Sequence, residues 1–271
     1  MSAAAPRIER TSLTWNVLRV LGCIIYLFLF APVIVVILLA FNSASTGSFP
    51  MQGYSLQWFG RLLENDSIGD AFVTSLVLAV SSATLATLIG IMAAIALVRY
   101  NFPGKAVIGN LLSLPLLMPE VVLAVAMLLV LKLLHQPRSF LLLLLGHTVL
   151  ALPYVVLVMQ ARLIGLRQHY EEAAKTLGAG PLQTFLEITL PLVAPAVIGG
   201  FLFAATLSFD DITATLFWKK PGIETVPTKI FAMLRTSVSP EINALGAVMI
   251  AITILLSLLG SYAMRRLARQ G

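Results

Sequence analysis

The chain has 271 residues, of which 59% are hydrophobic and 11% are charged, whereas a soluble domain is about 45 to 50% apolar and about 25% charged. With a mean hydropathy of +0.95, this composition excludes an ordinary soluble globular domain. Its 18 Lys and Arg residues against 12 Asp and Glu residues give a net charge of +6. Without a large polar face, this charge indicates contact with lipid headgroups and not with nucleic acid. The single cysteine, Cys23, excludes an intrachain disulfide and a metal site built from cysteines.

Six stretches are long and apolar enough to cross a membrane, since a helix needs about 20 residues to cross about 30 Å of hydrocarbon. They are residues 20–41, 71–98, 106–131, 139–161, 188–209 and 242–264. Only the third contains a charged residue, Glu120. Each stretch is expected to be helical, because a lipid-exposed backbone must satisfy its own hydrogen bonds. The fold class is therefore predicted to be all-α, a polytopic membrane protein with six transmembrane helices. The first span exceeds the length of a signal-peptide core and is interpreted as a retained anchor.

The distribution of basic residues favours an orientation with both termini in the cytoplasm. This orientation places 11 of the 18 Lys and Arg residues inside and leaves 7 outside. Trp15, Trp58 and Trp218 lie near span ends, where amphipathic rings prefer the membrane interface.

Two long loops are expected on the outer side. Residues 42–69 carry turn signals at Gly47, Pro50 and Gly53, followed by a short amphipathic stretch, 56–63, that is expected to lie along the surface. Residues 218–241 are bounded by turn residues, which predicts an ordered loop.

The connection over residues 162–190 is predicted to lie inside and to contain two short helices. Glu171 and Glu172 suit the start of a helix, Gly178 is a natural stop, and Pro181 suits the first turn of the next helix. One face of the first helix carries two adjacent alanines between two larger apolar residues. This face either docks into a partner protein or packs on its own helix bundle.

The spacing of residues in this connection resembles a known family signature. The EAA signature of the membrane subunits of binding-protein-dependent ABC importers is matched at its full spacing by Glu172, Ala173, Ala174, Gly178, Ile188, Leu190 and Pro191. With six spans and the signature between the fourth and fifth, the chain resembles a type I ABC importer permease from about residue 15 onward. Residues 118–122, 208–211 and 221–245 resemble the second permease of spermidine/putrescine importers. Related permeases for other organic solutes, such as opine-like compounds, share parts of this pattern.

This resemblance implies a machine of several subunits in a bacterial inner membrane. The chain would pair with a homologous second permease, two ATPase subunits would bind inside, and a periplasmic binding protein would deliver the solute. The helix from Glu171 to Gly178 would sit in a cleft of the ATPase. The chain has no phosphate-binding loop of the G-x-x-x-x-G-K-[ST] type, so ATP and Mg²⁺ would be bound by the partner ATPase and not by this chain. Residues 16–265 would form the permease domain, with the coupling loop at 162–190, between cytoplasmic tails at 1–15 and 266–271.

Acidic residues inside or directly at the end of a span are costly, so Glu120, Asp210 and Asp211 are candidates for the substrate pathway. Carboxylates in the outer half of the membrane would match the ammonium groups of a polycation. The alternatives are structural: Asp210 or Asp211 pairs with the second permease or lies in water, and Glu120 caps a helix broken at Pro119. Glu241 is interpreted first as a helix-start carboxylate and second as a contact for the binding protein.

Other functional classes fit less well. The D-D-x-x-D spacing of a magnesium-dependent enzyme fails at Ala214, and no other catalytic constellation replaces it. A proton-coupled secondary transporter using Glu120 and His147 would often show repeated halves, and none is found. His147 is more typical of a satisfied helix contact. A purely structural membrane subunit would predict that changes at Glu120 leave uptake intact.

Overall fold

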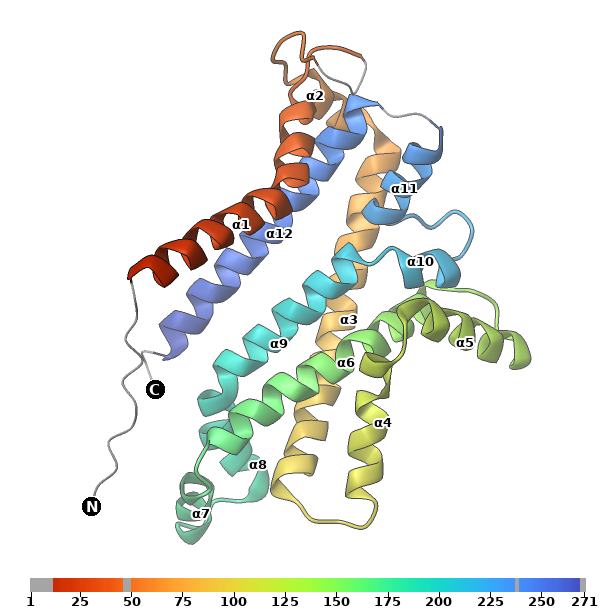
Figure 1. Cartoon of the computed structure of the whole chain (residues 1–271). Coiled ribbons are helices and arrows are strands. Elements are labelled where there is room, and N and C mark those ends of the chain that lie inside the picture. Colours follow the sequence, from red (N-terminus) through yellow and green to blue (C-terminus); the bar gives the residue numbers. More distant parts are fainter. Residues whose placement is uncertain (1–11, 46–49, 237–238, 269–271) are drawn as a thin grey trace. The chain divides into compact units, whose positions relative to one another are not determined.

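The computed structural model describes residues 12–45, 50–236 and 239–268, and these are helical almost throughout (Figure 1). The helices are α1 Ser12–Ala40, α2 Gln57–Glu64, α3 Asp66–Arg99, α4 Lys105–Leu117, α5 Glu120–Leu133, α6 Phe140–Gly165, α7 His169–Thr176, α8 Pro181–Thr184, the π-helical turn η1 Phe185–Thr189, α9 Leu190–Asp210, α10 Thr213–Trp218, α11 Val226–Thr236 and α12 Pro240–Ala268. The all-α prediction is confirmed. The predicted turn at Gly47 and the outer parts of both tails, 1–11 and 269–271, lie outside the described residues.

Five of the predicted spans are single long apolar stretches: Trp15–Ala40, Asp66–Arg99, Phe140–Gly165, Pro181–Asp210 and Pro240–Arg266. The third predicted span is not one straight helix. It consists of α4 and α5, which are bent by 113° to each other, so the described residues contain five long apolar helices, or six spans if the bent pair is taken as one. Met118, between them, is extended at φ −96° and ψ 138°, as expected for a residue held out of the helical region by a following proline. Glu120 therefore lies at the start of the second half of this bent pair and not inside a straight helix.

The chain divides into two compact units. The first comprises the described residues up to Leu62 together with 239–248. Within it, the segment after α1 folds back on itself: the Trp58 Nε1 group donates a 2.6 Å hydrogen bond to the carbonyl of Asn42. The side chain of Asn42, which is fully buried, accepts from the amides of Ala44 and Gln52 at 3.2 Å. These bonds fix the start of α2, the predicted amphipathic stretch.

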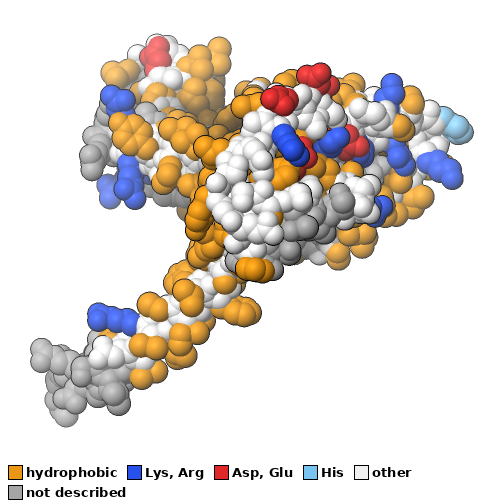
Figure 2. Space-filling view, turned by 90° about the horizontal axis from the view of Figure 1, so that it is seen from above, with side chains coloured by type: hydrophobic (Ala, Val, Ile, Leu, Met, Phe, Trp, Pro, Cys, Tyr) orange, Lys and Arg blue, Asp and Glu red, His pale blue; other side chains and the backbone are white. Residues whose placement is uncertain are grey.

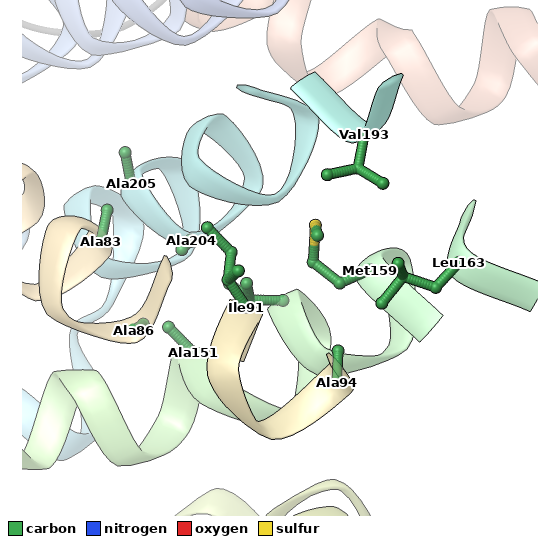
Figure 3. Close-up of a cluster of buried hydrophobic side chains, with 11 residues drawn as sticks. Ala83, Ala86, Ile91, Ala94, Ala151, Met159, Leu163, Val193, Ala204 and Ala205 are labelled. Atoms are coloured by element: carbon green, nitrogen blue, oxygen red, sulfur yellow. The ribbon is translucent and has the colours of Figure 1, made fainter. Parts of the chain in front are cut away.

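The second unit, residues 63–236 and 249–268, is built around α3, α6 and α9 (Figure 3). Small side chains such as Ala86, Ala151 and Ala204 bring these helices close together, as the Ala-rich and Gly-rich spans lead one to expect. A Cβ atom on Gly90 would lie only 2.6 Å from Cγ1 of Val155, so the approach of α3 to α6 requires glycine there.

Large apolar side chains remain exposed on the helices of both units, and Figure 2 shows hydrophobic side chains over much of the visible surface. Such a surface is suited to lipid and to further membrane helices. The interface role expected of two tryptophans is wrong: Trp58 is 4% exposed and Trp218 is 1% exposed, whereas Trp15 is 41% exposed. Trp218 is a core residue whose Nε1 group donates to the carbonyl of Ala124 at 2.9 Å.

Candidate functional site

A cavity of about 420 Å³ opens beside the break between α4 and α5. Its polar lining comes from Glu120, His147, Thr206, Ser208, Asp210, Asp211 and Thr213. Its apolar lining includes two aromatic rings, Tyr154 of α6 and Phe203 of α9, whose centroids are 5.0 Å apart. The cavity therefore brings all three intramembrane acids of the sequence to one place, next to a wall of apolar side chains. The described residues that line it include no Lys or Arg.

Two of the acids converge on one backbone group. The amide of Ala214, in the first turn of α10, donates to both Oε1 of Glu120 and Oδ1 of Asp211 at 3.3 Å. The other oxygen of Asp211 accepts from the amide of Thr215 at 2.8 Å and from its hydroxyl at 2.7 Å. Asp211 thus caps the start of α10, and Glu120 ties the start of α5 to the same point. The helix break expected at Pro119 is seen, and α5 begins at Glu120, but the side chain of Glu120 bonds to the start of α10 and does not cap α5.

Asp210 has a different environment. It ends α9 with an exposed side chain, and its Oδ1 accepts a long hydrogen bond of 3.4 Å from the hydroxyl of Thr253 in α12. Asp210 and Glu120 are both exposed and each accepts one long hydrogen bond among the described residues, whereas Asp211 accepts three. Asp210 and Glu120 are therefore freer than Asp211 to meet a cation in the cavity.

At the opposite end of α6, the 162–190 segment forms the two predicted short helices, α7 and α8. Gly178 lies between them with φ +91°, in the left-handed region that favours glycine. Its amide donates to the carbonyl of Lys175, and the amide of Ala179 donates to that of Ala174, both at 3.0 Å. This pair of bonds is a Schellman cap, which satisfies the last carbonyls of α7 and turns the chain into α8.

The two adjacent glutamates of α7 face different surroundings. Glu171 is largely buried, forms an ion pair of 3.2 Å with Arg99 at the end of α3, and accepts a 3.1 Å hydrogen bond from the hydroxyl of Thr189. The Glu172 side chain is 62% exposed and, among the residues that the structure describes, pairs with the exposed His169 alone, at 3.2 Å. Glu171 therefore attaches α7 to α3 and η1, while Glu172 remains accessible.

The apolar face of α7 stays uncovered by the described residues. Tyr170 is 55% exposed and Leu177 is 89% exposed. With Ala173 and Ala174 they border a hollow of about 510 Å³ that extends to Ile188 of η1. The sequence left two interpretations of this face, docking into a partner or packing on the chain's own bundle. Because the face is exposed, it does not pack on the described helices of this chain. An exposed apolar hollow next to charged side chains is typical of a docking surface.

Comparison with known proteins agrees with this architecture. Residues 86–270 match the family described as binding-protein-dependent transport system inner membrane component. The chain belongs to this family. The permease is 39% identical to the spermidine/putrescine transport system permease protein PotC of Escherichia coli (strain K12) over 232 residues, which is 86% of this chain and 88% of the relative. It is 36% identical to the putrescine transport system permease protein PotI of the same strain, over 90% of this chain and 89% of the relative.

Solved structures share the fold of the permease. A chain of a bacterial ABC transporter that imports the acidic polysaccharide alginate matches with a TM-score of 0.69 at 17% identity, covering 97% of this chain and 99% of that one. The alginate transporter in complex with an alginate pentasaccharide-bound periplasmic protein gives 0.73 at 18% identity, with 96% of both chains covered. The permease is therefore a multi-pass inner-membrane transport protein with the ABC importer permease fold.

The remaining sequence-predicted residues of the permease are placed as follows. Leu190 and Pro191 open α9 directly after η1, and Glu241 lies in the first turn of α12, as its helix-start interpretation predicts. Sequence reasoning missed Arg99, Thr215 and the aromatic pair. An arginine at the end of an apolar span is ordinary, so no local signal pointed to a partner 72 residues away. The Arg99–Glu171 ion pair arises only when the fold brings α3 and α7 together.

Proposed function

We propose that the permease translocates polyamines, such as spermidine or putrescine, by alternating access through the cavity beside Glu120 and Asp210. The observation that carries this proposal is the composition of the cavity wall: three carboxylates, no Lys or Arg among the described lining residues, and an apolar surface between them. A polyamine consists of ammonium groups separated by methylene segments, so charged and apolar parts of the wall each have a counterpart. The names of the relatives support the same solute class.

The driving force would come from other subunits. Glu172, Ala173, Ala174 and Gly178 would dock into a partner ATPase dimer that binds ATP and Mg²⁺, and Ile188, Leu190 and Pro191 would pass its movement to α9. The exposed face and hollow of α7 support this role. A homologous second permease would complete the pathway, and a periplasmic binding protein would deliver the solute, with Glu241 as a candidate contact. Residues 16–265 would form the permease domain, with both termini in the cytoplasm.

A second candidate solute follows from the same cavity. Another small organic solute, such as an opine or amino-acid derivative, would pair with Asp210 through its cationic group. The hydrogen bond from Thr253 favours a structural role instead, in which Asp210 holds the end of α9 to α12 within this chain.

Uptake by reconstituted complexes tests the assignment. Asp210→Asn removes one charge from the cavity while keeping its shape, so spermidine uptake should fall several-fold more than the yield of assembled complex. Asp70→Asn is the matched control, because Asp70 is an exposed acid on α3 outside the cavity. Loss of assembly in Asp210→Asn would make Asp210 an assembly residue.

A tag at the carboxy terminus should be accessible only from the cytoplasmic side, and labelling from outside would overturn the orientation.

A further inference from the structure

His147 is a buried titratable residue in the membrane to which the transport proposal assigns no part. It lies in α6, its side chain is 1% exposed, and it contacts groups on two other helices. Its Nδ1 atom is 2.8 Å from the hydroxyl of Ser208 in α9, and its Nε2 atom is 3.0 Å from the hydroxyl of Thr215 in α10. Both ring nitrogens are therefore used. Such a side chain is held in one orientation, and its ring nitrogens do not form hydrogen bonds with solvent.

The direction of these hydrogen bonds can be worked out from Asp211. An ionised carboxylate only accepts hydrogen bonds, so the 2.7 Å contact between Oδ2 of Asp211 and Oγ1 of Thr215 requires the threonine to donate. The single hydrogen of Thr215 is then committed, and Nε2 of His147 must donate to Oγ1. In the Nε2–H tautomer Nδ1 carries no hydrogen, so on the other side of the ring the hydroxyl of Ser208 donates to Nδ1. Ser208 in turn accepts a 3.0 Å bond from Ser82 of α3, whose hydroxyl also lies 3.2 Å from the carbonyl of Ala79.

The result is a one-way chain of hydrogen bonds from α3 to the cavity: Ser82, Ser208, His147, Thr215 and Asp211. His147 is not itself hydrogen-bonded to Asp211 through a short contact, since Nε2 lies 3.5 Å from Oδ2. It acts on the carboxylate through Thr215. Because Oδ2 is held in this way, Oδ1 is left facing the amide of Ala214, which it shares with Glu120.

We infer that His147, as the Nε2–H tautomer, is a positioning residue that acts through Thr215 to fix the Asp211 carboxylate beside Glu120 for cation transport. This inference rests on the proposed function for its consequence in transport. A carboxylate held from behind by a committed donor cannot turn away when a cation arrives, so its charge is presented at one place in the cavity. Loss of either donor would let it rotate.

The test uses the complete transporter, reconstituted with its ATPase, second permease and binding protein. Thr215→Val removes the hydroxyl and keeps the shape, and should lower spermidine import per ATP hydrolysed by about tenfold, the change expected when a hydrogen bond to a charged group is lost. Thr148→Val is the matched control, because Thr148 is also buried and its hydroxyl bonds only to the carbonyl of Leu144 in its own helix. This control should import like the wild type.

Two substitutions at His147 test the direction of the chain. In His147→Gln the amide nitrogen can occupy the place of Nε2 and donate to Thr215, so import per ATP should largely be retained. His147→Asn is too short to reach Thr215 and should behave like Thr215→Val. If Thr215→Val matches Thr148→Val, or if Asn replaces His147 better than Gln does, the inference is overturned.

A spectroscopic readout separates this inference from the proposed function. Histidine ¹⁵N resonances of the complex should show His147 protonated at Nε2 and unprotonated at Nδ1, assigned by comparison with the His147→Gln variant. The opposite tautomer would overturn the hydrogen-bond chain whatever the solute is. A wild-type complex that shows the expected tautomer but imports no polyamine would contradict the proposed function and confine His147 to orienting Asp211.

Discussion

Oε2 of Glu171 lies 3.2 Å from Nε of Arg99, and this ion pair joins the exposed helix α7 to the end of the core helix α3. Both side chains are nearly buried, at 13% and 10% exposure, and Arg99 also donates to the carbonyl of Leu166. The neighbouring Glu172 points outward. One turn of α7 therefore carries one glutamate that holds it to the membrane bundle and another that is available to a partner.

Exchanging the charges of the Arg99–Glu171 pair should show whether it transmits movement. Removing one partner of a largely buried pair costs on the order of 2 kcal/mol, a factor of about 30 in an equilibrium constant, so Glu171→Arg and Arg99→Glu should each lower ATP-driven import by up to about 30-fold. The double variant should recover much of this loss, because the opposite charges again face each other. Import into proteoliposomes measures all three. A double variant no better than the single ones would show that the pair has no specific role.

Leu177 should contribute to the ATPase docking surface. It is 89% exposed on the apolar side of α7, so Leu177→Glu should leave the permease folded but reduce the amount of ATPase that co-purifies with it. Leu63→Glu provides the control, since Leu63 is 90% exposed on α2 at the predicted outer side. Equal retention of ATPase in both variants would contradict the docking assignment.

Gly178 should be required for its backbone conformation and not for lack of space. A Cβ atom there meets no other atom within 4 Å, but φ is +91°. Gly178→Ala should therefore destabilise the turn by about 1 kcal/mol and weaken coupling of ATP hydrolysis to import. Gly180→Ala is the comparison: its surroundings are equally open, but its φ is −70°, which alanine adopts readily. The amount of solute imported per ATP hydrolysed, measured for both variants side by side, should fall in Gly178→Ala and not in Gly180→Ala. Equal effects would exclude the backbone explanation.

Gly146 should be required for the opposite reason. A Cβ atom at this position would lie 2.3 Å from the ring of Trp218, so Gly146→Ala must displace that ring from its contact with Ala124. We expect a loss of about 1 to 3 kcal/mol in stability, visible as a lower unfolding temperature of the purified permease. Gly69→Ala is the control, because its new methyl group meets no atom within 4 Å and should leave the unfolding temperature unchanged. An unfolding temperature that Gly146→Ala leaves unchanged would show that α10 is not packed against α6 as described.

Much of the architecture could be predicted from local sequence. The long apolar runs predicted the spans, and Gly178 with Pro181 predicted the turn between α7 and α8, because backbone conformation at these residues depends on their own chemistry. The sharp bend at Met118 was harder to predict, since prolines inside an apolar run, here Pro115 and Pro119, are compatible with a kink or a full break. Trp218 shows the limit most clearly: an aromatic ring near a span end suits either the interface or the core, and only the space left by Gly146 decides between them.

The candidate cavity depended still more on the fold. The acids at 120, 210 and 211 stand out because charge is rare in the spans, but their grouping follows from the break between α4 and α5. Thr215 and Arg99 gave no signal at all. Their roles arise from partners on other helices, which periodicity and composition do not reveal.

The most direct measurement of the central claim is ATP hydrolysis by the reconstituted complex with its binding protein, scanned against spermidine, putrescine, amino acids and opine-like solutes. The account predicts that hydrolysis is stimulated by a polyamine and that the same polyamine accumulates inside the vesicles. Stimulation by an uncharged or acidic solute alone would contradict the cation pathway at Glu120 and Asp210. No stimulation by any binding-protein-bound solute would contradict the ATP-coupled mechanism itself.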